Sequence, residues 1–399
     1  MLTSLAFIFL AGLFMAGVCQ RLHLPRIIGM LFTGILLGPY LLNLLDSSIL
    51  SISSDLRQMA LIIILIKAGL SLNLSDLKKV GRPAVLMSCV PATCEILGFL
   101  LFAPAILHIT RVEAAVMGAV LAAVSPAVVV PRMVQLMESG YGTNKSIPQL
   151  IMAGASCDDI FVIVLFSTFL SMAQGGSASL MDFAGIPISI VLGILLGAAA
   201  GYLLSLFFET AYAHKHYIRN SMKVILVLGV AFLLMAIETW LENIVPVSGL
   251  LAVVSMACTI KLKSISFVSK RLSEKFGKLW IAAEVLLFVL VGAAVDIRYT
   301  LQASPGALLM ILTALVFRSI GVSLCLLGTP LAPKERLFCV IAYLPKATVQ
   351  AAIGSVPLAM GLPCGQIVLS VAVLAILVTA PLGALGMDLT YHRFLSKSS

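Results

Sequence analysis

Two adjacent carboxylates, Asp158 and Asp159, stand in the middle of a long apolar stretch of the sequence. They are the only charged residues between Lys145 and Asp182. The apolar run 147–172 around them has the length of a membrane-spanning helix and places both acids near its centre. One aspartate at the bilayer midplane costs about 2.5–3.5 kcal/mol, and two cost roughly twice that. Because charged groups at this depth usually serve a function, the pair indicates an ion or proton site.

The chemistry expected of this pair is competition between a proton and a small cation. Desolvation disfavours the ionised form of a carboxyl group, and a second carboxylate beside it does so further. Such a site can hold a proton near neutral pH and still ionise when a cation replaces the proton's charge. If the site faces the two sides of a membrane in turn, this competition produces antiport. No ATP is needed, and the sequence contains no Walker A signature.

The two aspartates need not contact the same ion in the same way. Adjacent residues of a helix point about 100° apart. We therefore expect Asp159 to be the direct metal ligand of the cation, and Asp158 to be its helper or an alternate proton carrier. The hydroxyls of Ser156, beside the pair, and of Ser125, in the preceding apolar run, complete the candidate ion site.

The composition of the chain is that of a polytopic membrane protein. Of its 399 residues, 61% are hydrophobic and 11% are charged, and the mean hydropathy is +1.12. A soluble globular domain could not make its surface polar from so few charges. The first apolar run, 2–18, lacks a basic leader and a small-residue cleavage site, so we expect it to be the first span.

The cysteines do not indicate a metal centre or a disulfide framework. All eight are scattered along the chain, without a CxxC motif or a Cys/His cluster. We expect no resident cofactor, and the only ions involved to be the transported Na⁺ or Li⁺ and H⁺.

Apolar runs of spanning length recur along the whole sequence, and we expect about thirteen transmembrane helices. Connections between them are short. The expected spans are 2–19, 24–42, 56–73, 84–107, 113–137, 147–172, 184–208, 221–241, 246–262, 278–295, 305–328, 336–357 and 364–388.

The basic residues predict the orientation of these spans. With the N-terminus outside, the loops after odd-numbered spans and the C-terminal tail hold twenty lysines and arginines, and the opposite loops hold only Arg111 and Arg298. This bias predicts a cytoplasmic C-terminus in the inner (plasma) membrane of a cell. It also explains the net charge of +9 through contact with the lipid bilayer, so no nucleic acid is expected as a partner.

The spans can be divided into two inverted six-helix repeats within a single transporter domain, 1–399. The first repeat is 1–172, a linking span lies in 173–220, and the second repeat is 221–399. An odd number of spans separates equivalent helices, so the two copies run in opposite directions. The division pairs 84–107 with 305–328, where Glu95 and Arg318 occupy matching places with opposite charges.

Prolines predict two discontinuous helices at repeat-equivalent positions. Pro126 lies near the middle of 113–137, and Pro345 near the middle of 336–357, where Lys346 and Thr348 follow it. Proline breaks or kinks a helix, and ordinary kinks are common in membrane helices. Two crossing breaks would instead expose charged half-helix ends and free carbonyls at the ion site. Lys346 could balance such an end, or it could snorkel in the cytoplasmic funnel.

Three motifs resemble one known family. The chain is similar to the sodium/proton antiporters of the cation:proton antiporter superfamily, in the two-aspartate, NHA-type branch, and the resemblance covers the whole sequence. The motifs that carry it are Ala155-Ser156-Cys157-Asp158-Asp159, Val124-Ser125-Pro126-Ala127-Val128-Val129-Val130-Pro131 and Leu344-Pro345-Lys346-Ala347-Thr348-Val349-Gln350-Ala351-Ala352.

This resemblance implies an all-α membrane protein with the NhaA-like antiporter fold, assembled as a homodimer. Its mobile core would be 84–172 and 305–388. Asp159 would be the main ligand, Asp158 its helper, and Glu95 and Arg318 a buried ion pair. The best-known electrogenic members place a lysine where Arg318 stands. Because arginine stays protonated, we expect electroneutral exchange.

The function expected is therefore a secondary Na⁺ or Li⁺/H⁺ antiporter rather than an enzyme. Intramembrane aspartyl proteases also use two aspartates, but on separate helices and with a GxGD-type motif, which is absent here. The alternative is a sodium-coupled symporter of an organic anion on the same fold.

Overall fold

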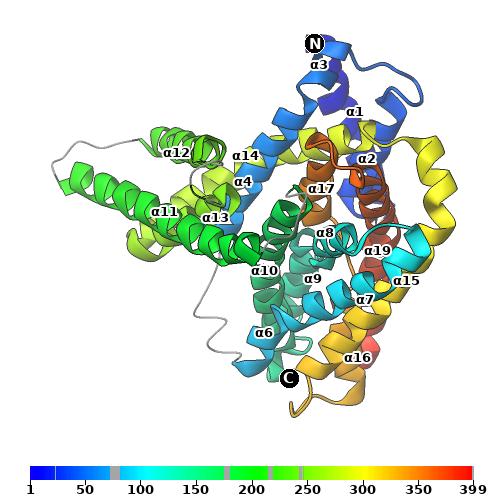
Figure 1. The fold of residues 1–399 in the computed structure, drawn as a ribbon. Coiled ribbons are helices and arrows are strands. Elements are labelled where there is room, and N and C mark those ends of the chain that lie inside the picture. Colours follow the sequence, from blue (N-terminus) through cyan, green and yellow to red (C-terminus); the bar gives the residue numbers. More distant parts are fainter. Residues whose placement is uncertain are drawn as a thin grey trace. The chain divides into compact units, whose positions relative to one another are not determined.

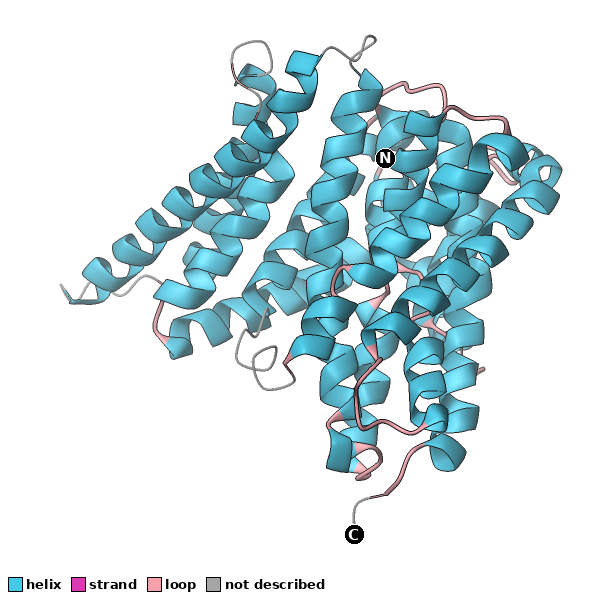
Figure 2. Ribbon diagram, turned by 60° about the horizontal axis from the view of Figure 1, so that its bottom comes forward, coloured by secondary structure: helices cyan, strands magenta, loops and turns pink. Residues whose placement is uncertain are grey.

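The computed structural model describes residues 1–22, 24–71, 81–174, 180–213, 219–241, 245 and 247–397. All the regular elements in these ranges are helices, apart from one isolated β-bridge (Figure 1, Figure 2). The helices are α1 (Leu2–Arg21), α2 (Arg26–Leu37), α3 (Ser47–Ser51), α4 (Ser53–Ser71), α6 (Arg82–Met87), α7 (Val90–Leu107), α8 (Arg111–Ala122), α9 (Pro126–Glu138), η1 (Thr143–Lys145), α10 (Ile147–Gln174), α11 (Leu180–Ala213), α12 (Asn220–Leu241), α13 (Gly249–Lys263), α14 (Ser266–Ala293), α15 (Ile297–Cys325), α16 (Pro333–Ala342), α17 (Thr348–Gly354), α18 (Val356–Ala359) and α19 (Gly365–Phe394).

Eight helices in the described part of the chain are long and apolar enough to cross a membrane unaided. The all-helical membrane-protein fold expected from the composition is thereby confirmed. The eight segments are Leu2–Arg21, Arg82–Leu107, Ile147–Gln174, Val191–Thr210, Asn220–Leu241, Phe267–Ala293, Pro305–Cys325 and Gly365–Phe394.

The number of thirteen spans stays a prediction. Each expected span overlaps between one and three consecutive helices. Several of these helices are too short to cross a bilayer alone, since a crossing takes about 20 residues. One example is α2, with 12 residues. The span expected at 113–137 is divided between α8 and α9, and the span expected at 336–357 includes parts of α16, α17 and α18.

The chain forms two compact units. The first contains Met1–Arg57, Asn73–Phe169 and Val285–Ser399, and the second Gln58–Leu72 and Leu170–Glu284. In the first unit α7 packs along both α15 and α8, and α19 packs against α15 and α16. All the charged residues of the candidate site belong to this unit. The two units do not test the expected inverted repeats or the expected mobile core. Both therefore remain predictions.

The second unit is built on the close packing of α11 against α13. Gly197 on α11 faces the backbone of Ala252 on α13, and a side chain at this glycine would overlap the Ala252 carbonyl. Small residues allow helix backbones to approach closely in membranes, where dispersion contacts must replace the hydrophobic drive between helices.

The chain leaves helical geometry near Pro126 and Pro345 in the first unit. The helix α8 ends at Ala122, three extended residues follow, and α9 begins at Pro126. Proline suits the first position of a helix, since its missing N–H would have no intrahelical acceptor there. The helix α16 ends at Ala342, and α17 begins at Thr348 after a non-helical segment that contains Pro345.

Candidate cation and proton site

The two helix breaks meet inside the first unit. The backbone N–H of Ser125 donates to the carbonyl of Pro345 at 2.8 Å. The side chain of Gln350, on α17, accepts from the N–H of Ala347 at 2.8 Å and donates to the carbonyl of Ala123 at 2.7 Å. Buried backbone groups freed by a helix break need such partners, because no water reaches them in the bilayer core. These bonds fix the two breaks against each other.

Gln350 provides a test of this arrangement. Gln350→Leu should lower the thermal unfolding temperature of the detergent-solubilised protein, since it leaves the Ala347 N–H and the Ala123 carbonyl unpaired. Each unpaired group costs about 1–3 kcal/mol. Gln135→Leu changes an exposed glutamine on α9 and is the control. Equal unfolding temperatures for the two variants would contradict the role given to Gln350.

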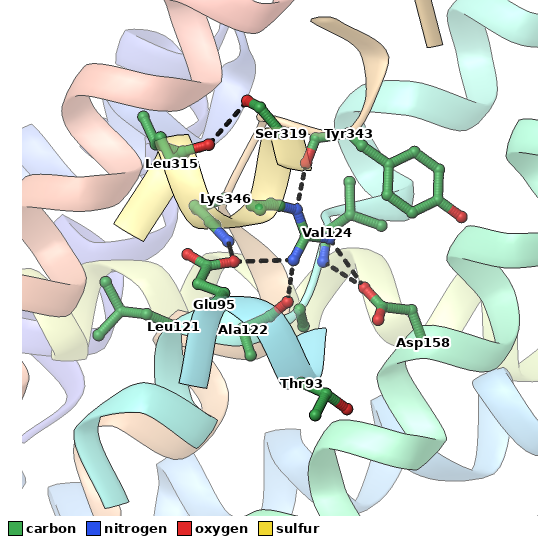
Figure 3. A network of polar contacts seen from close by, with 12 residues as sticks. Thr93, Glu95, Leu121, Ala122, Val124, Asp158, Leu315, Ser319, Tyr343 and Lys346 are labelled. Carbon is green, nitrogen blue, oxygen red and sulfur yellow. Dashed lines mark hydrogen bonds and ion pairs between the residues drawn. The ribbon is translucent and has the colours of Figure 1, made fainter. Parts of the chain in front are cut away.

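Five ionisable side chains gather around the breaks, and all are almost completely buried. Their exposed fractions are 8% for Asp159 and at most 1% for the others. Figure 3 shows most of this network in close-up. The five come from α7, α10, α15 and the segment before α17, and they are Glu95, Asp158, Asp159, Arg318 and Lys346.

Arg318 binds two of the three acids. Its Nη1 lies 2.8 Å from Glu95 Oε2, and its Nη2 lies 3.1 Å from Asp158 Oδ2. The structure thus brings together the two residues that the repeat pairing matched, Glu95 and Arg318, and adds Asp158 to them. Charge-assisted bonds from a planar guanidinium hold such acids in fixed orientations.

The same guanidinium also serves the two helix breaks. Arg318 donates to the carbonyl of Ala122, the last residue of α8, and to the carbonyl of Tyr343, the residue that follows α16 (Figure 3). The C-terminal end of a helix carries a partial negative charge. One arginine therefore balances the negative ends of both half-helices as well as two carboxylates.

Lys346 lies in the second break and binds Glu95. Its Nζ is 2.6 Å from Glu95 Oε2, and its backbone N–H donates to Thr379 Oγ1 at 2.9 Å. Its side chain is 1% exposed, which excludes a snorkelling position in an open funnel. Glu95 therefore accepts from two cations, a pairing that the sequence did not indicate.

Asp158 is fixed at one of its two carboxyl oxygens. Its Oδ2 accepts from the Val124 N–H at 2.8 Å and from Arg318, while Oδ1 has no hydrogen-bond partner within the described ranges. The first helix break is thereby held to α10. One oxygen of this carboxylate remains available to a further ligand.

Asp159 is the third buried acid of the site. None of the described residues forms an ion pair with it, and its Oδ1 lacks a hydrogen-bond partner among them. Ser125 Oγ is fully buried and likewise unpartnered in that part of the chain. The side chain of Ser156 lies outside the described residues. The unpartnered atoms are all oxygen, the ligand that hard cations prefer.

The charges of the site leave one carboxylate uncompensated. Glu95, Asp158 and Asp159 contribute three negative charges when ionised, and Arg318 and Lys346 contribute two positive ones. Both cations form ion pairs with Glu95 or Asp158. A single proton or a single monovalent cation at Asp159 would make this buried cluster neutral.

Three contributors to the site were not expected from the sequence, namely Gln350, Thr379 and Tyr343. Gln350 had a local signal, because it stands three residues after the N-cap of α17 and bonds back to it in a capping pattern. Thr379 and Tyr343 lie in apolar runs without any distinguishing pattern, and they reach the site only through tertiary packing.

The family of the chain follows from comparison with known proteins. A family model described as "Sodium/hydrogen exchanger, transmembrane" matches residues 5–388. The chain belongs to the sodium/hydrogen exchanger family. This confirms the resemblance drawn from the three motifs. Family membership also indicates an integral membrane transporter rather than an enzyme.

Several animal members of the exchanger family are similar to the chain along most of its length. Sodium/hydrogen exchanger 9B2 of Mus musculus is 34% identical over 388 residues, which cover 94% of this chain and 69% of that protein. The 9B2 protein of Homo sapiens is 34% identical over 396 residues, which cover 94% of this chain and 70% of the relative. Sodium/hydrogen exchanger 9B1 of Homo sapiens is 33% identical over 364 residues, covering 86% and 67%.

A solved structure shares the fold of this exchanger-family chain. The sodium proton antiporter MjNhaP1 from Methanocaldococcus jannaschii, determined at pH 8, superimposes with a TM-score of 0.82. The sequences are 21% identical, and the match covers 98% of this chain and 99% of that one. The antiporter fold expected from the sequence is confirmed. The organic-anion symporter is not favoured, because the family model and the relatives are sodium/hydrogen exchangers.

Proposed function

We propose that the chain exchanges Na⁺ for H⁺ by alternating access, with both ions competing for Asp159. The observation that carries this proposal is the charge of the buried cluster, where Asp159 is the carboxylate without a cation among the described residues. The family of the chain and the names of its relatives support Na⁺ as the cation.

The same charge count favours one-for-one, electroneutral exchange. A proton and a sodium ion carry equal charge, so either one neutralises Asp159 and the loaded cluster crosses between states uncharged. Arg318 stays protonated under all relevant conditions, and Lys346 is held as a partner of Glu95. Arg318 is therefore not free to release a second proton in each cycle.

Three further parts of the proposal, namely the second cation, the membrane orientation and the homodimer, rest on the sequence. We propose Li⁺ as a second substrate, because its charge equals that of Na⁺ and its ligands are also oxygen atoms. The distribution of basic residues supports an N-terminus outside and a cytoplasmic C-terminus in the plasma membrane. The resemblance to the NHA-type branch supports a homodimer with 84–172 and 305–388 as its mobile core.

Electroneutral exchange can be tested in proteoliposomes that contain an internal pH dye. Addition of Na⁺ or Li⁺ outside should drive protons out of the lumen and raise its pH. Clamping the membrane potential at zero with valinomycin and K⁺ should leave the initial rate unchanged. A potential-sensitive dye should not respond beyond the signal of protein-free liposomes. A dye response that grows with the transport rate would contradict one-for-one exchange.

A further inference from the structure

Tyr343 carries a buried hydroxyl group that the exchange site as described does not use. Its side chain is fully buried at the end of α16, and its backbone carbonyl accepts from Arg318. The hydroxyl has no hydrogen-bond partner among the described residues. Burying a hydroxyl without a hydrogen-bond partner costs folding free energy that a phenylalanine at the same place would not cost. The presence of tyrosine here therefore calls for an explanation.

The Tyr343 hydroxyl lies against α10, one helical turn before Asp158. A Cβ atom built on Gly154 would overlap this hydroxyl, so the glycine leaves the space that the phenol occupies. Gly154 and Asp158 are four residues apart and therefore share one face of α10. Side chains of a helix lean toward its N-terminus, which directs the Asp158 carboxylate over the turn where the hydroxyl lies.

Two unpartnered atoms of complementary type thus face the same turn of α10. The phenol O–H is a donor and the free oxygen of Asp158, Oδ1, is an acceptor. Figure 3 draws the Tyr343 ring and the Asp158 carboxylate, both to the right of Val124. The two groups are not hydrogen-bonded in this structure, in which Val124 and Arg318 hold Asp158 through Oδ2.

We propose that Tyr343 is a positioning residue of the exchange site, whose hydroxyl donates to Asp158 Oδ1 in another state of the transport cycle. The inference rests on the exchange proposed at Asp159. The bond fixes the orientation of the Asp158 carboxylate beside Asp159, the carboxylate proposed to exchange its proton for a cation. The hydroxyl has a partner in one state and none in the other, so it favours the state in which the bond forms.

This role predicts opposite effects of one substitution on stability and on transport. Tyr343→Phe removes the unpaired hydroxyl and so stabilises the state described here. The opposite state loses a hydrogen bond, and the equilibrium between the two shifts. We expect the unfolding temperature to stay equal or rise, and the Na⁺-driven exchange rate to fall about tenfold, the factor that corresponds to 1.4 kcal/mol.

The pH dependence of exchange separates positioning from simple packing. Protons and Na⁺ are proposed to compete at this site, so a displaced Asp158 carboxylate should shift the half-maximal pH of exchange, whereas a change in packing alone should not. The other ionisable groups around Asp158 are identical in the two proteins being compared. They are Asp159 and Cys157 on α10, Arg318 and Cys325 on α15, Cys89 before α7, and Lys346.

The experiment compares wild type, Tyr343→Phe and Tyr299→Phe in proteoliposomes and in detergent. Tyr299 is an exposed tyrosine on α15, and its variant should match wild type in rate, pH profile and unfolding temperature. An unchanged rate and pH profile in Tyr343→Phe would overturn the inference, whatever its unfolding temperature. If wild type itself showed no Na⁺-driven exchange, the proposed function would fail instead, so the two failures are distinguishable.

Discussion

Asp159→Asn should reduce Na⁺-driven proton exchange to the level of protein-free liposomes. Asparagine has nearly the shape of aspartate but cannot ionise, so it neither releases a proton nor supplies negative charge to a cation. The other four buried charges keep their partners, because the ion pairs among them do not involve Asp159. We therefore expect the variant to fold and to unfold at a temperature no lower than that of wild type.

The control for this substitution is Asp55→Asn. Asp55 is an exposed aspartate in the first turn of α4, and its variant should exchange at the wild-type rate. Measuring the pH change in the lumen after addition of Na⁺ compares all three proteins. If Asp159→Asn exchanged at the wild-type rate, Asp159 could not be the residue that binds the exchanged ions.

Arg318→Met should be the most destabilising single change in the buried network. It leaves Asp158 without its cation, and it leaves the carbonyls of Ala122 and Tyr343 without a donor. Breaking a buried ion pair from one side costs about 3–5 kcal/mol, because an uncompensated charge remains in a medium of low polarity. Denaturant or thermal unfolding in detergent measures this loss.

A second substitution should recover part of that stability. Glu95→Gln in the Arg318→Met background restores the balance of charge, with Lys346 then the one cation of the network and Asp158 still negative. The double variant should be less destabilised than the sum of the two single variants, a coupling that a double-mutant cycle measures. Strict additivity would show that the charges are not mutually dependent.

Arg132→Met is the matched arginine control. Arg132 binds Asp388 through two nitrogen atoms, at 3.0 and 3.1 Å, but the Asp388 side chain is 47% exposed. Exposed ion pairs contribute about 0–1 kcal/mol. A loss as large as that of Arg318→Met would contradict the importance assigned to burial.

The sequence predicted the features of the fold that depend on local pattern. Hydropathy indicated the apolar helices, because burial in lipid acts on each segment separately. The prolines at 126 and 345 indicated the two breaks, since proline acts on the helix that contains it. The acidic pair indicated the site through its cost in the membrane.

The partners of the buried charges could not be predicted in the same way. Lys346 and Glu95 are 251 residues apart, and Arg318 and Asp158 are 160 apart. Their contacts depend on the rotation and depth at which the helices pack, which no local pattern encodes. The opposite charges of Glu95 and Arg318 at repeat-equivalent positions were the one long-range signal. Nothing comparable indicated Lys346 as a second partner of Glu95, or Tyr343 beside Gly154.

The claim on which the whole account depends is that one carboxylate holds either a proton or a cation. Purified protein in a weakly buffered detergent solution, near the pH of half-maximal exchange, allows a direct measurement of protons released when Na⁺ is added. We expect release that saturates with Na⁺ at no more than about one proton per chain, and none from Asp159→Asn. Saturable binding of Na⁺ to the wild-type protein without release of protons would contradict the account.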